Sequence, residues 1–230
     1  MLYIVVPFRA GADQPWRAKQ LEQFLGYMHR YLKGVAGEIW VIEQLGSAPF
    51  NRGALMNVGF IAINPKKGDT IILHDVDLLP SSSLYMYYTY NGDNIHHIGG
   101  VFSRYENESF FGGVLSIPAH VFYDVNGFPN DYWGWGGEDV ELKERLLERG
   151  YTVFKPTRGS LVDMENMDVV AKLAFLKAHN LKCKNKRELR KKYAEARKLG
   201  EHVNGLKEVV ANIHAVQKRT HCHIYATLNT

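Results

Sequence analysis

The sequence has few cysteines and no long apolar run, and both shortages limit the kind of protein it can form. Cys183 and Cys222 are the only cysteines among 230 residues, which excludes a disulfide framework and a zinc site made of cysteine alone. The pair fits a reducing compartment, although a single bridge between the two stays open. No window of about 18 uninterrupted apolar residues occurs, which excludes a transmembrane helix. Residues 1–7 are apolar but lack a preceding basic region, so they predict a first strand and not a signal peptide.

The composition is that of a globular protein, with 46% apolar and 23% charged residues, and it excludes general disorder. The net charge of +4 has a local origin, because the segment from Lys182 to Lys198 contains nine basic and two acidic residues. Such a segment is typical of a solvated helix face. The functional alternatives are contacts with nucleic acid, a membrane surface or an anionic polymer, and no nucleic-acid-binding motif accompanies it.

Short β-branched runs alternate with amphipathic helical patterns in the first third of the chain. This alternation predicts an α/β fold with a mainly parallel central sheet flanked by helices. Strands are predicted over 2–7, 38–43, 70–74, 95–102, 112–117, 151–155 and 222–228, and helices over 14–32, 51–63, 138–149, 169–178, 186–199 and 205–213.

Two carboxylates follow the third predicted strand, in the run Asp75-Val76-Asp77. In a parallel α/β sheet, ligands bind beyond the carboxyl ends of the strands. Carboxylates at such a position can hold Mg²⁺ or Mn²⁺ together with a diphosphate. The alternative is a pair of loop carboxylates that cap a turn.

A loop of tryptophan and glycine, Trp133-Gly134-Trp135-Gly136-Gly137, directly precedes Glu138 and Asp139. Glycine lets the backbone approach a ligand closely, and a flat indole can stack on the apolar face of a sugar ring. Either acid can accept hydrogen bonds from sugar hydroxyls, and one can accept a proton. The alternative is an aromatic core cluster followed by two ordinary first-turn acids.

Arg52, at the start of a predicted helix, has two interpretations. It can pair with a phosphate or stack on a base. It can also be a surface arginine beside Asn51, which would then be the N-cap of the helix. Phe8 and Arg9, which follow the first predicted strand, have the same ambiguity.

Six motifs occur in order along residues 1–168. They are Pro7-Phe8-Arg9, Phe50-Asn51-Arg52, Asp75-Val76-Asp77, Phe111-Gly112-Gly113-Val114, Asn126-Gly127-Phe128-Pro129 and the run from Trp133 to Asp139. Together they resemble the catalytic domain of the beta-1,4-galactosyltransferases, glycosyltransferase family 7, which includes the xylosylprotein galactosyltransferase branch. The resemblance implies one GT-A type catalytic domain over residues 1–230. Within it, residues 1–80 form the nucleotide-binding half, 81–168 the acceptor and catalytic half, and 169–230 a helical tail that returns as a final strand.

The resemblance also implies the activity and the site. The activity is metal-dependent, inverting transfer of galactose from UDP-galactose to a hydroxyl of an acceptor sugar, with a β-1,4 linkage. The residues implied for donor binding are Pro7, Phe8, Arg9, Phe50, Arg52, Asp75, Val76, Asp77 and Trp135. The residues implied for acceptor binding are Phe110, Trp135, Gly136, Gly137, Glu138 and Asp139. Glu138 and Asp139 are the implied catalytic pair, with Asp139 as general base, and Asp77 is the implied ligand of Mn²⁺, with Mg²⁺ as the alternative metal.

Two positions depart from the family's pattern. The family completes its metal site with histidine, or with methionine and histidine, whereas residues 162–168 of this chain contain no histidine. Glu165 falls where a family histidine is expected and is predicted to replace it as a metal ligand; the alternative is weak or lost metal binding. Phe110 stands where several members have a tyrosine that shapes the donor-sugar pocket. UDP-N-acetylgalactosamine and UDP-glucose are therefore alternative donors, and a non-catalytic carbohydrate- or nucleotide-binding module is the rival class.

The expected partners are a UDP-sugar donor and a glycan or glycoconjugate acceptor, and no nucleic acid is expected. Because the chain shows no signal peptide or anchor, we expect a cytoplasmic enzyme or an excised soluble domain. If it is a truncated animal-type enzyme, the expected location is the Golgi lumen. No motif specifies the acceptor or the oligomeric state.

Overall fold

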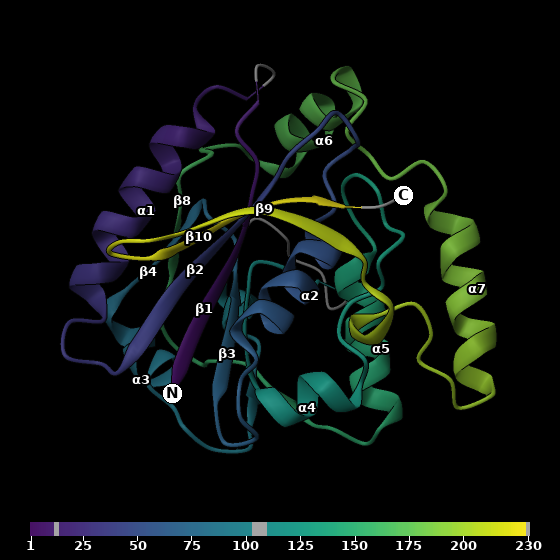
Figure 1. The fold of residues 1–230 in the computed structure, drawn as a ribbon, viewed down its shortest axis with the longest axis horizontal. Coiled ribbons are helices and arrows are strands. Elements are labelled where there is room, and N and C mark those ends of the chain that lie inside the picture. Colours follow the sequence, from purple (N-terminus) through teal and green to yellow (C-terminus); the bar gives the residue numbers. More distant parts are fainter. Residues whose placement is uncertain (12–13, 103–109, 229–230) are drawn as a thin grey trace.

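The chain folds around a central sheet, in a computed structural model that describes residues 1–11, 14–102 and 110–228 (Figure 1). Its strands are β1 (Leu2–Phe8), β2 (Gly37–Gln44), β3 (Thr70–His74), β4 (Leu78–Pro80), β5 (Ile95–His96), β6 (Val114–Pro118), β7 (Val153–Phe154), β8 (Leu161–Asp163), β9 (Ala211–Lys218) and β10 (Cys222–Leu228). Its helices are α1 (Arg17–Tyr31), α2 (Arg52–Ile63), α3 (Tyr85–Tyr88), α4 (Ala119–Asp124), α5 (Glu138–Glu148), α6 (Val169–Ala178) and α7 (Lys186–Lys198).

The main sheet has eight strands in the order β7-β5-β6-β3-β1-β2-β10-β9, and β4 pairs separately with β8. Its centre is parallel, because β1 pairs in parallel with β2 and β3, and β10 pairs in parallel with β2. Strand β6 runs antiparallel to β3, and β9 runs antiparallel to β10. The predicted α/β fold with a mostly parallel central sheet and flanking helices is confirmed.

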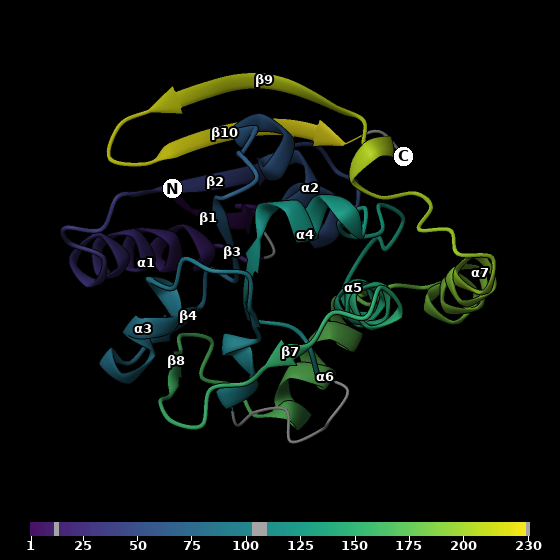
Figure 2. The ribbon, with the colours of Figure 1, turned by 90° about the horizontal axis from the view of Figure 1, so that it is seen from below.

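Both faces of the sheet are covered, which explains why its central strands are apolar at nearly every position. Ile4 and Val6 of β1 belong to one buried cluster with Phe24 and Met28 of α1. Val5, which points to the opposite face, belongs to a second cluster with residues of α2 and α5. Figure 2 shows the β9–β10 hairpin along one edge of the molecule and α7 on the outer side of α5. With both faces of the sheet buried, a ligand site has to lie at an end of the strands.

Several predicted elements match the structure and two do not. The strands at 70–74 and 222–228 and the helix at 169–178 have the predicted bounds. The helix predicted over 205–213 is wrong, because Leu206–Glu208 form only a 3₁₀ turn and the exposed strand β9 follows. The strand predicted over 95–102 ends at His96, and Ile98–Val101 form a 3₁₀ turn.

The structure also bears on the two cysteines and on membrane-spanning helices. Cys183 and Cys222 are both free and buried, so the single bridge that the sequence left open is not formed. Within the described residues, no helix combines the length and the apolar composition needed to cross a lipid bilayer.

Candidate active site

The predicted site residues meet in one cleft at the carboxyl ends of β1 and β3. Its cavity has a volume of about 480 Å³. The cavity is lined by Pro7, Phe8, Arg9, Phe50, Arg52, Asp75, Val76, Asp77, Phe110, Trp135, Gly136, Gly137, Glu138, Asp139 and Glu165. Parallel strands end at the same edge of the sheet, so residues far apart in the sequence converge there. Asp77 and Asp139 therefore face a common hollow.

An arginine and a phenylalanine form one wall of the cleft, at the end of β1. Arg9 donates from Nη1 to the carbonyl oxygen of Ala48 at 2.6 Å, and its guanidinium lies 5.8 Å from the ring centroid of Phe50. Buried Gln44 fixes the loop that carries Phe50, since its Oε1 accepts a hydrogen bond from the backbone N–H of Asn51 at 2.8 Å. The wall thus presents a cation and an aromatic ring, which suit a phosphate and a base.

Arg52 connects the two sides of the cleft. Asn51 is the N-cap of α2, because its side chain accepts a hydrogen bond from the backbone N–H of Ala54 at 3.0 Å. The Arg52 side chain turns inward: its Nε lies 2.7 Å from Asp75 Oδ1 and its Nη1 lies 3.7 Å from Glu138 Oε1. Burial lowers the pKa of Arg52, but the two carboxylates outweigh that effect and raise the pKa above its ordinary value. The interpretation of Arg52 as a surface residue is wrong, whereas the N-cap is confirmed.

A second strand pairing builds a cluster of three carboxylates. Asp77 is followed by β4, and β4 pairs with β8 so that Leu78 lies opposite Asp163. The backbone N–H of Met164 donates to the carbonyl oxygen of Asp77 at 2.8 Å. As a result, one carboxylate oxygen each from Asp77, Asp163 and Glu165 lies within 4.8 Å of the others. Asp163 was missed in the sequence, although the acid-x-acid spacing of 163 and 165 repeats that of 75 and 77.

Two cations, which the sequence analysis did not predict, contact this carboxylate cluster. Arg17, the first residue of α1, places Nη1 3.2 Å from Asp77 Oδ2 and Nη2 2.8 Å from Glu165 Oε1. Lys172 of α6 places Nζ 2.6 Å from each Glu165 oxygen. Carboxylate oxygens are suitable ligands for Mn²⁺ or Mg²⁺, so the donor set fits such a metal. The two cations reduce the formal charge of the three carboxylates from −3 to −1 and compete with the metal.

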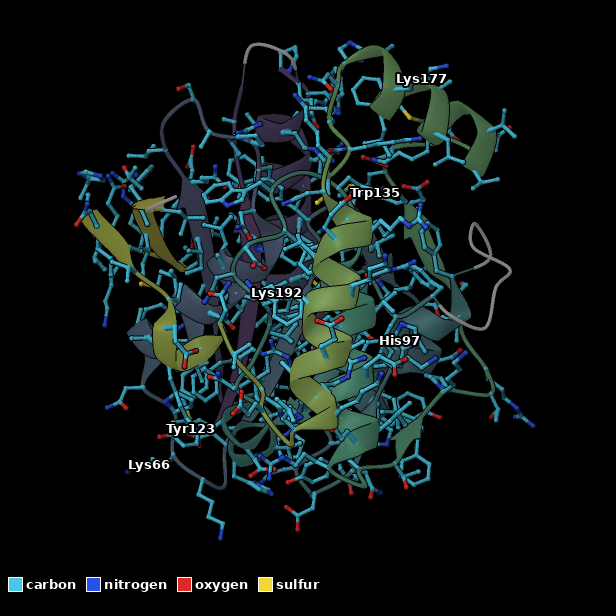
Figure 3. All side chains as sticks on the ribbon, turned by 90° about the vertical axis from the view of Figure 1, so that its right-hand side faces the viewer. Lys66, His97, Tyr123, Trp135, Lys177 and Lys192 are labelled. Carbon is cyan, nitrogen blue, oxygen red and sulfur yellow. The ribbon has the colours of Figure 1, made fainter. Side chains whose placement is uncertain are left out.

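Glycines shape the tryptophan loop on the opposite side of the cleft. Gly134, Gly136 and Gly137 have φ angles of 94°, 97° and 115°, which side chains rarely permit. This backbone leaves Trp135 39% exposed at the cleft, and its N–H donates to the carbonyl oxygen of Leu181 at 2.7 Å. Figure 3 shows Trp135 beside the end of α7. The interpretation of Trp135 as part of a core aromatic cluster is wrong.

The loop ends at the two acids that begin α5. Glu138 is only 7% exposed, and its Oε2 has no hydrogen-bond partner among the described residues. Burial and the neighbouring charge of Asp139 raise the pKa of Glu138 to about 7. Asp139 accepts a hydrogen bond from the N–H of Val140 at 2.8 Å, and its other oxygen faces the backbone of Gly112. A buried carboxylate with an unused oxygen is suited to accept a hydrogen bond from a ligand hydroxyl.

The sequence matches models of a known protein family. The family model described as the N-terminal region of glycosyl transferase group 7 matches residues 2–90, and the model described as the N-terminal domain of galactosyltransferase matches residues 96–168. Beta-1,4-galactosyltransferase 7 of Drosophila melanogaster is 34% identical over 193 residues, which cover 82% of this chain. The same alignment covers 58% of that relative, so this chain spans little more than half its length.

Solved structures show the same similarity across the whole chain. The catalytic domain of Drosophila beta-1,4-galactosyltransferase 7, in complex with xylobiose, has a TM-score of 0.79 and 29% sequence identity. The similarity covers 100% of this chain and 94% of that one. A variant of the same fly enzyme, with a TM-score of 0.79 and 28% identity, was solved with manganese, UDP-Gal and xylobiose.

Proposed function

The chain belongs to the glycosyl transferase group 7 family, and on this basis we propose that it transfers galactose from UDP-galactose to a hydroxyl of an acceptor sugar. The proposed reaction needs a divalent metal, inverts the anomeric carbon and forms a β-1,4 linkage. Its support is the similarity to the beta-1,4-galactosyltransferases together with the geometry of the cleft.

The donor would lie between the Arg9–Phe50 wall and the carboxylate cluster. Phe50 would stack on the uracil, and Arg9 would face the phosphates. Asp77, Asp163 and Glu165 would hold Mn²⁺, which when bound acts as a Lewis acid on the leaving diphosphate. Arg17 and Lys172 would stabilise the same developing negative charge from the protein side.

The acceptor would lie on the Trp135 side, with its sugar ring against the indole. The unpartnered Oε2 of Glu138 would accept a hydrogen bond from an acceptor hydroxyl and orient the ring. Asp139 would take the proton from the attacking acceptor hydroxyl. As it does so, the hydroxyl oxygen of the acceptor forms a bond to the anomeric carbon of galactose, and the bond between that carbon and UDP breaks. Attack from the face opposite the leaving diphosphate inverts the anomeric centre.

One observation carries the proposal most strongly: Asp77 and Asp139 line the same cleft, with Arg52 paired to Asp75 on one side and Glu138 on the other. In-line displacement requires both substrates in one hollow with their reacting atoms aligned. Two alternatives remain, namely a different UDP-hexose as the donor and a binding module without turnover.

Release of UDP, measured with UDP-galactose, UDP-N-acetylgalactosamine and UDP-glucose, tests the proposal. Each donor is incubated with xylobiose, with and without Mn²⁺. We expect release that depends on the acceptor, is fastest with UDP-galactose, and falls strongly after chelation of the metal. Faster release with either other donor would reassign the donor sugar. Binding of UDP-galactose without any release would favour the binding module.

A further inference from the structure

Two basic residues of α7 enter the cleft beside the tryptophan loop. Lys186 and Arg190 are four residues apart, so they share one face of the helix, and both line the cavity. The Nζ of Lys186 lies 5.8 Å from the ring centroid of Trp135. It also lies 3.1 Å from the point where a Cβ of Gly136 would stand. The ammonium group is therefore next to the backbone that leads into Glu138 and Asp139.

The position of α7 is fixed by packing and by the backbone. The N–H of Cys183 donates to the carbonyl oxygen of Trp135 at 3.2 Å, alongside the hydrogen bond from Trp135 to Leu181. Leu189 and Tyr193 of α7 are buried with Tyr132 in a small core of their own. Figure 3, in which Trp135 and Lys192 are labelled, shows the tryptophan near one end of α7 and the lysine along it. These contacts hold Lys186 and Arg190 in place at the edge of the cleft.

Two other basic residues of α7 are paired with carboxylates. Lys192 pairs with Asp131 at 2.7 Å, and Arg197 pairs with Glu141. Within the described part of the chain, no ion pair involves Lys186 or Arg190. Two cations at the mouth of a cleft attract an anion, and they offset the repulsion that the carboxylates of the site would exert on it.

We propose that Lys186 and Arg190 form a subsite for an anionic group on the acceptor, so that the preferred acceptor is an acidic glycan or glycoconjugate. A carboxylate or a sulfate, attached next to the sugar that stacks on Trp135, would satisfy this subsite. The inference rests on the proposed function, because it assigns the Trp135 side of the cleft to the acceptor. It gives part of the basic segment a role in acceptor selection.

The test compares neutral and charged acceptors on wild type and two double variants. The probes are phenyl, 4-carboxyphenyl and 4-sulfophenyl β-D-xylosides, with calorimetric binding in the presence of UDP as one readout and kcat/KM as the other. The first variant is Lys186→Gln with Arg190→Gln. The control, Lys184→Gln with Lys191→Gln, removes the same charge from exposed positions of the same segment that do not line the cavity.

We expect wild type and the control to bind the charged xylosides about three- to tenfold more tightly than the neutral one. The ratio should fall to about one in the first variant, while its affinity for UDP stays within about twofold of wild type. Comparing the 4-carboxyphenyl probe with the 4-sulfophenyl probe, whose sulfonate stands in for a sulfate, identifies which anion the subsite prefers.

Three results would overturn the proposal: equal binding of charged and neutral xylosides by wild type, an unchanged ratio in the first variant, or a loss of UDP affinity as large as the loss of acceptor affinity. The last result would assign the two cations to the donor diphosphate. Failure of the proposed function can be told apart from failure of the subsite proposal. If the proposed function is wrong, galactose is transferred to none of the three xylosides, but the ratio of calorimetric affinities for charged and neutral xylosides still reports on the subsite.

Discussion

Replacing Lys172 with methionine should tighten the binding of Mn²⁺. The Lys172 ammonium lies 2.6 Å from both oxygens of Glu165, so it occupies the carboxylate that a metal would share with Asp77 and Asp163. Methionine keeps most of the volume and removes the charge. Arg17 still pairs with Glu165 at 2.8 Å in the variant, so the buried carboxylate keeps a counter-ion and the fold should survive.

The magnitude follows from Coulomb's law. A metal bound to Glu165 would lie about 4.5 Å from the ammonium, where a dication and a unit charge repel by about 2 kcal/mol even at the dielectric constant of water. That energy corresponds to about thirtyfold in affinity. The side chains of Lys172 and Glu165 are only 8% and 4% exposed, which weakens the screening. Without Lys172 the Glu165 side chain is freer, so the metal has to order it on binding, which lowers the affinity somewhat. We expect a net increase in Mn²⁺ affinity of at least about tenfold.

Electron paramagnetic resonance of free Mn²⁺ measures the affinity directly, without a need for turnover. The matched control is Lys177→Met, which removes the same charge from an exposed position of the same helix. Lys177 is labelled in Figure 3. The control should bind Mn²⁺ as wild type does. If Lys172→Met binds Mn²⁺ no more tightly than the control, Lys172 does not compete with the metal and the reasoning fails.

Three further predictions concern the acids of the site and the interior. Asp139→Asn should lower kcat by about a thousandfold while calorimetry shows UDP affinity within about twofold of wild type; near-normal turnover would remove Asp139 as the base. Folding raises the pKa of Glu138 from 4.5 to about 7, so its contribution to stability is full below pH 4.5 and is lost as the pH rises through about 7. The melting temperature of wild type relative to Glu138→Gln should therefore fall between pH 5 and pH 8, and a constant difference would contradict the shift. Arg145 is fully buried and donates hydrogen bonds to Glu141 and to the carbonyl oxygen of Val203. Arg145→Met should therefore lower the free energy of unfolding, measured in urea, by about 3–5 kcal/mol. A decrease under about 1 kcal/mol would argue against a structural role for Arg145.

The strands and several helices could be predicted because their signals are local. The apolar runs of β1 and β3 and the spacing of α6 report burial directly, and Asn51 carries the chemistry of an N-cap. The helix wrongly predicted over 205–213 falls where burial gives no signal. Strand β9 is mostly exposed, so its side chains show no alternating face, and its pairing with β10 decides its conformation.

The candidate site divides in the same way. The carboxyl-end rule placed Asp75 and Asp77 at the edge where a ligand binds, and the glycine–tryptophan run marked the opposite wall. The roles of these residues stay predictions. Glu165 was predicted from the family resemblance, but its partner Arg17 could not be foreseen, because Arg17 meets Asp77 across 60 positions and Glu165 across 148.

The order of residues alone determined which segments bury apolar faces, where strands end in acids, and which loop needs glycine, because each depends on neighbours a few positions away. Tertiary structure alone decided that β8 sets Asp163 and Glu165 beside Asp77, that Arg17 and Lys172 neutralise them, and that α7 brings Lys186 to Trp135. The physical reason is that charge interactions depend on distance in space, and only the packed sheet and its covering helices fix that distance.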